Sequence, residues 1–232
     1  MSEQVREMFS SIAPRYDLTN TVLSLGVDRL WRRQAVRASG AAPGARVLDC
    51  ATGTGDLALA LRRTVEPGGA VVAIDFCAPM LAPARQKAER AGLGDIRFEV
   101  ADALALPYPT SSFDVATIAF GIRNVDDPVR CLQEMSRVVR PGGRVVVLEF
   151  GQPTGLWGAL YRLYCRLLLP SLGGLLTGNR SAYRYLPRTA AAFPAGEAFL
   201  ARMDQAATFS SRQARSLCGG IAFVYVGEVR GA

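Results

Sequence analysis

The residues with the clearest chemical potential lie in the segment VLDCATGTGD, residues 47–56, where a short apolar run ends in an acid and leads into glycines. Gly53 and Gly55 carry no Cβ, so the backbone around them can approach a ligand closely. A helix expected from Asp56 would present free N–H groups beside the acid, Asp49. The segment therefore predicts a ligand-binding loop, although glycines after a strand also serve merely to turn a chain.

A second acid, Asp75, ends the next apolar run twenty residues after Gly55. A carboxylate at this position can accept hydrogen bonds from both hydroxyls of a ribose. Gly53, Gly55 and Asp75 together fit a nicotinamide dinucleotide and S-adenosylmethionine equally well.

Three further features favour S-adenosylmethionine. Asp49 would repel a pyrophosphate, whereas it can pair with the cationic amino-acid end of a methionyl group. Asp102 follows a third expected strand, where it is suited to contact the adenine amino group. The chain also contains no Tyr-x-x-x-Lys motif and no histidine for hydride chemistry. We therefore expect a methyl-donor site.

The elements that position these residues follow one repeated pattern. Pro-Gly precedes a β-branched run closed by an acid three times, and helical stretches and a further strand lie between them. The three runs span 43–49, 67–75 and 141–149, the helices 56–64 and 79–91, and the further strand 113–120. Strands that alternate with helices predict an α/β fold, a parallel sheet covered on both faces.

The 232 residues are expected to form a single domain, because half are hydrophobic and can build one sizeable core. Residues 1–42 have helical periodicity and are interpreted as an N-terminal lid, with residues 43–150 as the donor-binding core. Residues 151–232 would supply acceptor-side helices, a polar joint at 178–187, a helix near 196–207 and a final pair of strands.

Composition excludes several kinds of site. The absence of histidine excludes any imidazole base, nucleophile or ligand. Five scattered cysteines, an odd number without CxxC spacing, indicate neither a zinc site nor a disulfide framework, so we expect a cytoplasmic protein without a metal. The polar N-terminus predicts no secretion signal. Arg162, Arg166 and Pro170 interrupt the longest apolar stretch, 155–176, which argues against a membrane-spanning helix.

The net charge of +7 comes from 27 basic and 20 acidic residues, and Lys87 is the single lysine. Such a charge suits an anionic partner, although an arginine bias can also reflect only the coding composition of a genome.

Several longer motifs resemble the quinone-biosynthesis C-methyltransferases of the UbiE/MenG type. They are FSSIAPRYDLTNTVLSLGVDRLWRR, VLDCATGTGD, FGIRNVDDP, EMSRVVRPGGRVVVLEF and SAYRYLP, and they extend over nearly the whole chain. The resemblance implies a class I, Rossmann-like methyltransferase fold with a seven-stranded, mostly parallel sheet whose last strand is antiparallel. It also implies donor contacts from Thr54, Asp75, Asp102 and Ala103.

Three positions depart from the pattern of this family. Asp28 stands where a histidine is frequent, so any role for an imidazole there is lost. Gly151 and Ala119 stand where serines are common. Ala119 remains among the expected donor contacts, without the hydroxyl that serine would supply.

The resemblance implies methylation of a prenylated quinol in menaquinone or ubiquinone biosynthesis. Arg123 and Asn124, after the fourth strand, would face this acceptor, with Arg123 stabilising the developing phenolate. Tyr16 and Asp17 in the lid would orient the hydroxyl or accept its proton. In the alternative interpretation, Arg123 pairs with Asp126 or Asp127, and Tyr16 packs on Trp31.

The stretch 155–176 could line a groove for the prenyl tail or rest on a membrane surface, but a cover helix buried against the sheet is the first expectation. Arg180, Arg184 and Arg188 share one helical face, solvated or facing acidic headgroups. A homodimer and a peripheral position at the inner face of the membrane stay open.

Two other classes of function are weaker. Another small-molecule acceptor or RNA would use the same donor loop, but RNA binding should add a basic patch with stacking aromatics or a separate module, and neither is found. A non-enzymatic binding protein should have lost donor-site acids, which are intact.

Overall fold

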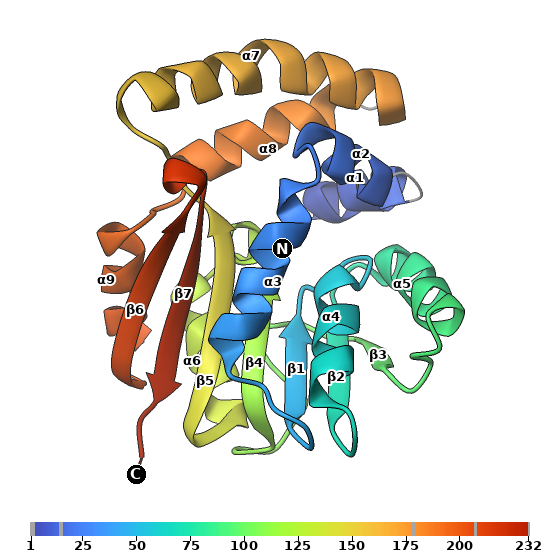
Figure 1. Ribbon diagram of the computed structural model, residues 1–232, viewed down its shortest axis with the longest axis vertical. Coiled ribbons are helices and arrows are strands. Elements are labelled where there is room, and N and C mark those ends of the chain that lie inside the picture. The colour runs from blue at the N-terminus through green and yellow to red at the C-terminus, as the bar shows by residue number, and fades with distance from the viewer. Residues whose placement is uncertain (1–2, 14–15, 178–179, 207, 232) are drawn as a thin grey trace.

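The computed structural model describes residues 3–13, 16–177, 180–206 and 208–231, which form a seven-stranded sheet in the order β3-β2-β1-β4-β5-β7-β6 (Figure 1). β1 to β5 are parallel, and β7 runs antiparallel to both β5 and β6. The strands are β1 Arg46–Cys50, β2 Ala70–Asp75, β3 Arg97–Val100, β4 Phe113–Ala119, β5 Val139–Phe150, β6 Phe209–Leu217 and β7 Ala222–Val229. The predicted fold class, including the antiparallel last strand, is confirmed.

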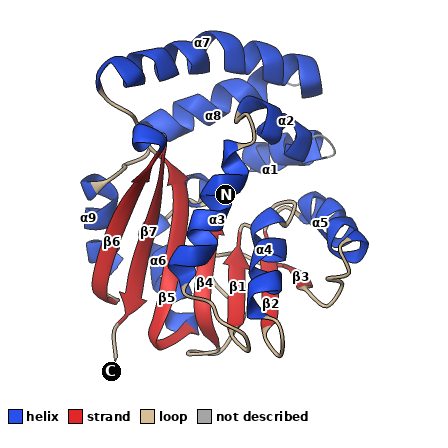
Figure 2. Ribbon diagram, viewed as in Figure 1, coloured by secondary structure: helices blue, strands red, loops and turns tan. Residues whose placement is uncertain are grey.

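Helices cover both faces of this sheet (Figure 2). The α-helices are α1 Glu3–Ile12, α2 Tyr16–Leu23, α3 Val27–Ser39, α4 Asp56–Val65, α5 Ala78–Arg90, α6 Pro128–Val138, α7 Gly155–Thr177, α8 Arg180–Ala192 and α9 Glu197–Ala206. Two short 3-10 turns are η2 Ile122–Asn124 and η3 Cys218–Gly220. In β1, Val47 points to the layer of α3, α4 and α5, whereas Leu48 points to the layer of α6 and α9. This alternation explains why the β1 run is apolar throughout.

The strand order reverses between β1 and β4, which are neighbours although they are distant in sequence. The connections after β1, β2, β3 and β4 therefore emerge at one edge of the sheet. Ligands of open α/β sheets bind at such a switch point. The predicted acids Asp49, Asp75 and Asp102 all lie at this edge, at or just after the strand ends.

Four helices gather beyond the carboxyl ends of the strands, where α7 crosses over α8 near α1 and α2 (Figure 1). α7 packs on α8 and α2 through Cys165 and Leu169, which are buried beside Ile12 and Leu186. The first expectation for 155–176, a helix buried against the sheet, is therefore wrong. Among the described residues, no helix is both long and apolar enough to cross a bilayer.

Two local predictions also differ from the structure. Of the predicted polar joint, 178–179 lie outside the described residues, and α8 begins at Arg180 and continues through Pro187. Leu186 packs into the cluster under α7, so burial offsets the poor helical propensity of the proline. The side chains of Arg180 and Arg184 lie outside the described residues, and Arg188 is exposed. The third Pro-Gly pair, at 141–142, lies inside β5, where the register with β4 shifts.

Candidate functional site

Asp49 lies at the end of β1 and is 1% exposed. Its carboxylate accepts hydrogen bonds from the hydroxyls of Thr52 (2.6 Å) and Thr117 (2.7 Å). Burial raises the pKa of Asp49 to about 6, against the lowering effect of the two hydroxyls. Among the residues that the structure describes, no cation is hydrogen-bonded to this carboxylate, so it is suited to receive one from a ligand.

Asp75 holds the glycine loop in place. Its carboxylate accepts hydrogen bonds from the backbone N–H groups of Gly53 (2.7 Å) and Cys77 (2.8 Å), and burial raises its pKa. Gly55 has a φ of +83°, and a Cβ there would lie 3.1 Å from the Cβ of Ala84. The loop therefore needs glycine at 55 for both backbone conformation and packing.

The other expected donor contacts lie just after β3 and at the end of β4, and of these only Ala119 shares a pocket with Asp49. Asp102 follows β3 and accepts a hydrogen bond from the N–H of Leu104 at 2.9 Å. The side chain of Ala103 is buried in the core, so only its backbone is available to a ligand. Ala119 ends β4 and lines a small pocket with Asp49, Gly53 and Thr54.

Asp17 lies apart from the acceptor side. It accepts hydrogen bonds from the hydroxyl of Thr54 and from the ammonium of Lys87, which is 2.6 Å away. The same ammonium pairs with Asp56 at 2.5 Å. Lys87 therefore joins α2 to the first turn of α4, next to the glycine loop. Sequence reasoning missed this contact, for which the single lysine of the chain was the available signal.

Replacing Lys87 with methionine should weaken the attachment of α2 to the segment around the glycine loop, because both of its ion pairs are lost. We expect the KM for the methyl donor to rise about threefold, because the ion pairs are partly exposed, while kcat changes little. Steady-state kinetics with varied donor concentration measure this. Methionine in place of exposed Arg90, on the same helix, is the control and should leave KM unchanged. An equal rise in KM in K87M and R90M would contradict a specific role for the contact of Lys87 with Asp17 and Asp56.

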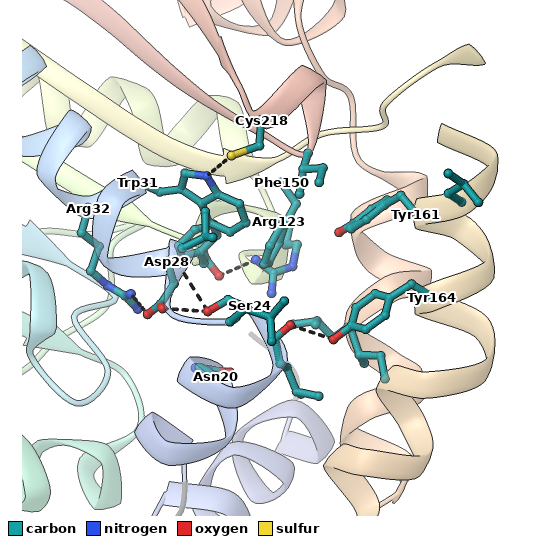
Figure 3. Close-up of a pocket in the computed structure, with 18 of the residues that line it drawn as sticks. Asn20, Ser24, Asp28, Trp31, Arg32, Arg123, Phe150, Tyr161, Tyr164 and Cys218 are labelled. Carbon is teal, nitrogen blue, oxygen red and sulfur yellow. Dashed lines mark hydrogen bonds and ion pairs between the residues drawn. The ribbon is translucent and has the colours of Figure 1, made fainter. Parts of the chain in front are cut away.

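A larger cavity of about 440 Å³ lies beside the glycine loop. It is enclosed by α2, α3, α7 and the turn after β6 (Figure 3). Its wall is mostly apolar and aromatic. Tyr161 and Tyr164 project into it from α7, opposite Trp31 of α3, whose indole N–H contacts the sulfur of Cys218 at 3.3 Å. A cavity of this size and polarity suits an aromatic small molecule.

Three residues line both this cavity and the small pocket beside the glycine loop: Tyr16, Arg32 and Phe120. Phe120 packs on Phe150, with tilted rings whose centroids are 4.5 Å apart, and the backbone φ of Phe120, +56°, is unusual for a non-glycine residue. Strained backbone of this kind concentrates at functional sites. The two hollows are thus separated by one layer of side chains.

Arg123 lines the cavity, and its side chain is only 2% exposed. One guanidinium nitrogen donates to Glu149 at 2.8 Å and to the carbonyl of Phe120 at 2.5 Å, and the group lies over the Phe150 ring. Burial raises the pKa of Glu149, although Arg123 opposes this. The alternative prediction paired Arg123 with Asp126 or Asp127, whereas in the structure its ion-pair partner is Glu149. Among the described residues, Nε of Arg123 is buried without a hydrogen-bond partner.

The remaining predicted acceptor residues divide between the cavity and its support. Tyr16 lies in the cavity wall, where burial raises its pKa, and its ring contacts Phe9 edge to face. Asn124 is not among the lining residues, and its side-chain oxygen accepts a hydrogen bond from Tyr185 of α8 at 3.1 Å. Asn124 thus ties α8 to the loop after β4.

Sequence reasoning missed Asp28 as a site residue. It is the only carboxylate among the described residues that line the cavity, and it is 6% exposed. Its oxygens accept hydrogen bonds from the hydroxyl of Ser24 (2.7 Å) and from Arg32 (2.5 Å), as Figure 3 shows. The sequence did carry a signal for Asp28, because it stands at a position where the family that the chain resembles often has histidine.

Comparisons with known proteins show the family to which this chain belongs. Residues 1–228 match the ubiE/COQ5 methyltransferase family. The ubiquinone/menaquinone biosynthesis C-methyltransferase UbiE of Bdellovibrio bacteriovorus is 52% identical over 98% of this chain and 97% of its own length. The demethylmenaquinone methyltransferase of Thermus thermophilus is 54% identical over 95% of this chain and 99% of its own.

Solved structures show the same fold at low sequence identity. A SAM-dependent methyltransferase from Aquifex aeolicus superposes with a TM-score of 0.64 at 18% identity, covering 85% of this chain and 89% of that one. One from Thermotoga maritima gives 0.65 at 20% identity, covering 96% and 98%. The predicted recognition, fold class and enzyme class are confirmed, and the predicted function agrees with the relatives' names. The chain belongs to the ubiE/COQ5 methyltransferase family and is an S-adenosylmethionine-dependent C-methyltransferase.

Proposed function

We propose that this enzyme methylates a ring carbon of a prenylated quinol, with demethylmenaquinol as the acceptor. The observation that carries this proposal is the shared wall of Tyr16, Arg32 and Phe120 between the donor loop and the aromatic cavity. A methyl group can pass directly between two ligands only when their reacting atoms are held in contact and in line. The names of the relatives supply the acceptor class.

The donor loop fits S-adenosylmethionine in its own chemistry. The buried carboxylate of Asp49 would bind the ammonium group of the methionyl end. The backbone of Gly53 and Thr54 would contact the donor beside this group. Asp75 would accept hydrogen bonds from the ribose hydroxyls, and Asp102 would contact the adenine amino group. The bound donor supplies an electrophilic methyl group, whose sulfur departs as a neutral thioether. Because this leaving group is already activated, the proposed reaction needs no metal.

Arg123 would stabilise the negative charge that develops on the quinol oxygen. The ring carbon attacks most readily when the neighbouring hydroxyl loses its proton, because the oxygen electron pair then flows into the ring. Arg123 lies in the cavity wall, so its guanidinium is a cation that such an oxygen would meet there. Glu149 holds the guanidinium in place for this role.

Asp28 is the proposed acceptor of the hydroxyl proton, through Ser24. The hydroxyl of Ser24 lies in the cavity wall and donates to Asp28 at 2.7 Å, so a proton from the quinol can pass along this pair. The methylated carbon then loses its own proton as the ring regains aromaticity and the oxygen is reprotonated. One proton is released overall. Tyr16 would orient the ring, and Asp17 would hold the lid.

Asparagine at position 28 should therefore lower kcat about 100-fold and leave the donor Kd unchanged. Asparagine at position 17 should instead raise the donor KM and leave kcat within about twofold, because Asp17 contacts Thr54 and Lys87. Single-turnover methyl transfer and donor titration separate the two effects. If the D17N variant loses turnover while D28N retains it, the assignment of the proton acceptor is reversed.

The redox state of the acceptor tests the proposed chemistry. Labelled donor is offered to demethylmenaquinone that is either reduced with dithionite or left oxidised. Label should enter only the reduced form, because the oxidised ring carbon is not a nucleophile. Equal labelling of both forms, or of neither, would contradict the proposal. No nucleic-acid partner forms part of it.

A further inference from the structure

The outer face of α7 exposes a regular row of large apolar side chains, the leucine stripe. It consists of Leu156, Leu160, Leu163 and Leu167, whose exposed fractions are 80%, 53%, 54% and 56%. Spacings of four, three and four residues place them on one side of a helix. Cys165 and Leu169, on the opposite side, are buried against the lid helices and α8. α7 is therefore packed on one face, and no described residue covers the leucine stripe on the other.

The leucine stripe continues into the mouth of the acceptor cavity. Leu160 belongs to both, and Trp157 beside it lines the cavity while 51% exposed. Leu25, which lies between α2 and α3, also lines the cavity and is 89% exposed. Contiguous apolar surface of this kind marks an interaction site. An apolar chain that leaves the cavity here would pass directly onto the stripe.

The charges of α7 point to an anionic apolar surface as the occupant. The helix contains no acidic residue, and its two charged residues, Arg162 and Arg166, are exposed and one turn apart. Long arginine side chains can lie along an apolar face and reach outward to phosphate. The exposed surface of α7 therefore offers leucines and a tryptophan to the apolar part of a lipid surface, and arginines to its phosphates.

We propose that the leucine stripe of α7 docks this enzyme on the surface of an anionic lipid bilayer, so that the cavity mouth opens toward the hydrocarbon. The helix would lie in the plane of the interface, with Arg162 and Arg166 at the lipid phosphates. This inference rests on the proposed function, since a prenylated acceptor is stored in the bilayer. It adds the surface and the lipid chemistry that deliver the acceptor.

Vesicle binding tests the docking without any methyl transfer. The full-length enzyme is mixed with phosphatidylcholine vesicles that contain or lack phosphatidylglycerol, with no quinone and no donor present. We expect sedimentation with the anionic vesicles and a blue shift in tryptophan emission from Trp157. Trp31, the other tryptophan, is 6% exposed and gives a constant background.

Two variants and a matched control test the surface. L163S/L167S, which lies outside the cavity wall, should weaken binding to anionic vesicles by about tenfold or more. R162Q/R166Q should remove the preference for anionic lipid. R63Q/R90Q, at exposed arginines of α4 and α5, lowers the net charge by the same two units as R162Q/R166Q does. It should keep the preference of the wild type for anionic vesicles. Unchanged thermal unfolding shows that each variant is folded.

Each outcome separates the docking from the reaction. Wild-type enzyme that ignores anionic vesicles, or L163S/L167S enzyme that binds them as tightly as wild type, would overturn the proposal. Wild-type enzyme that forms dimers, which L163S/L167S abolishes without any vesicle binding, would assign the stripe to a second copy instead. Vesicle binding with no methyl transfer to any quinol would leave the docking standing and contradict the proposed function alone.

Discussion

Asparagine in place of Asp49 should reduce the affinity for the methyl donor by about 100-fold or more and at the same time make the donor-free enzyme more stable. The loss of affinity follows from removing the buried negative charge that would pair with the ammonium group of the donor. Asparagine keeps the shape of the side chain. Its oxygen and nitrogen can still exchange hydrogen bonds with the hydroxyls of Thr52 and Thr117.

The gain in stability follows from the raised pKa of Asp49. Its ordinary pKa is 3.8, and in the folded protein it is about 6, so the folded state holds its proton more tightly than the unfolded state does. The stability linked to this proton is present below the ordinary pKa and is lost as pH rises through about 6. Near neutral pH, the charged carboxylate therefore costs the fold about 3 kcal/mol at most.

Denaturant unfolding of both proteins across pH measures this effect. The free energy of unfolding of D49N should exceed that of the wild type near neutral pH, and the difference should shrink on acidification through the interval between 6 and 3.8. Calorimetric titration gives the donor affinity. D204N, at an exposed acid on α9, is the control and should change neither quantity. Loss of stability in D49N with donor affinity retained would contradict the account of this loop.

Methionine in place of Arg123 should cost both stability and turnover. Glu149 would remain buried at 1% side-chain exposure without its partner, which typically destabilises a fold by about 3–5 kcal/mol. Methyl transfer should fall by about 100- to 1,000-fold, because the donor to the quinol oxygen is gone.

The double variant R123M/E149Q separates these two effects. Glutamine removes the stranded charge, so most of the lost stability should return, whereas turnover should stay low because the guanidinium is still absent. Chemical denaturation and single-turnover transfer are the two measurements. Recovery of activity together with stability would mean that Arg123 serves only the fold.

The sheet and the donor loop were predictable because their signals are local. β1 and β2 are each a short run that follows Pro-Gly and carries an acid near its end, and the strand ends of a parallel sheet meet at one edge. Asp49 and Asp75 could therefore be brought together from separate segments by topology alone. The hydrogen bond from Gly53 to Asp75 is consistent with that reasoning.

The acceptor cavity could not be predicted in the same way, because its wall comes from elements with no local signal for one another. Arg123 and Glu149 lie on different elements and meet only through the pairing of β4 with β5. Asp17 and Asp28 lie in the adjacent helices α2 and α3, and only the packing of those helices turns one toward Lys87 and the other into the cavity. Residues 178–187 were predicted to be a polar joint that ends in Pro187. In the structure α8 continues through this proline, because the packing of Leu186 stabilises the helix.

Methyl transfer to competing acceptors is the measurement that tests the central claim most directly. Labelled S-adenosylmethionine is offered in parallel with reduced demethylmenaquinone, a reduced ubiquinone precursor and bulk RNA, and label is counted in the organic and acid-precipitable fractions. We predict label in the organic fraction, on demethylmenaquinol, from wild-type enzyme and not from D49N. Label confined to RNA, or none in any quinol while the donor still binds, would contradict the claim.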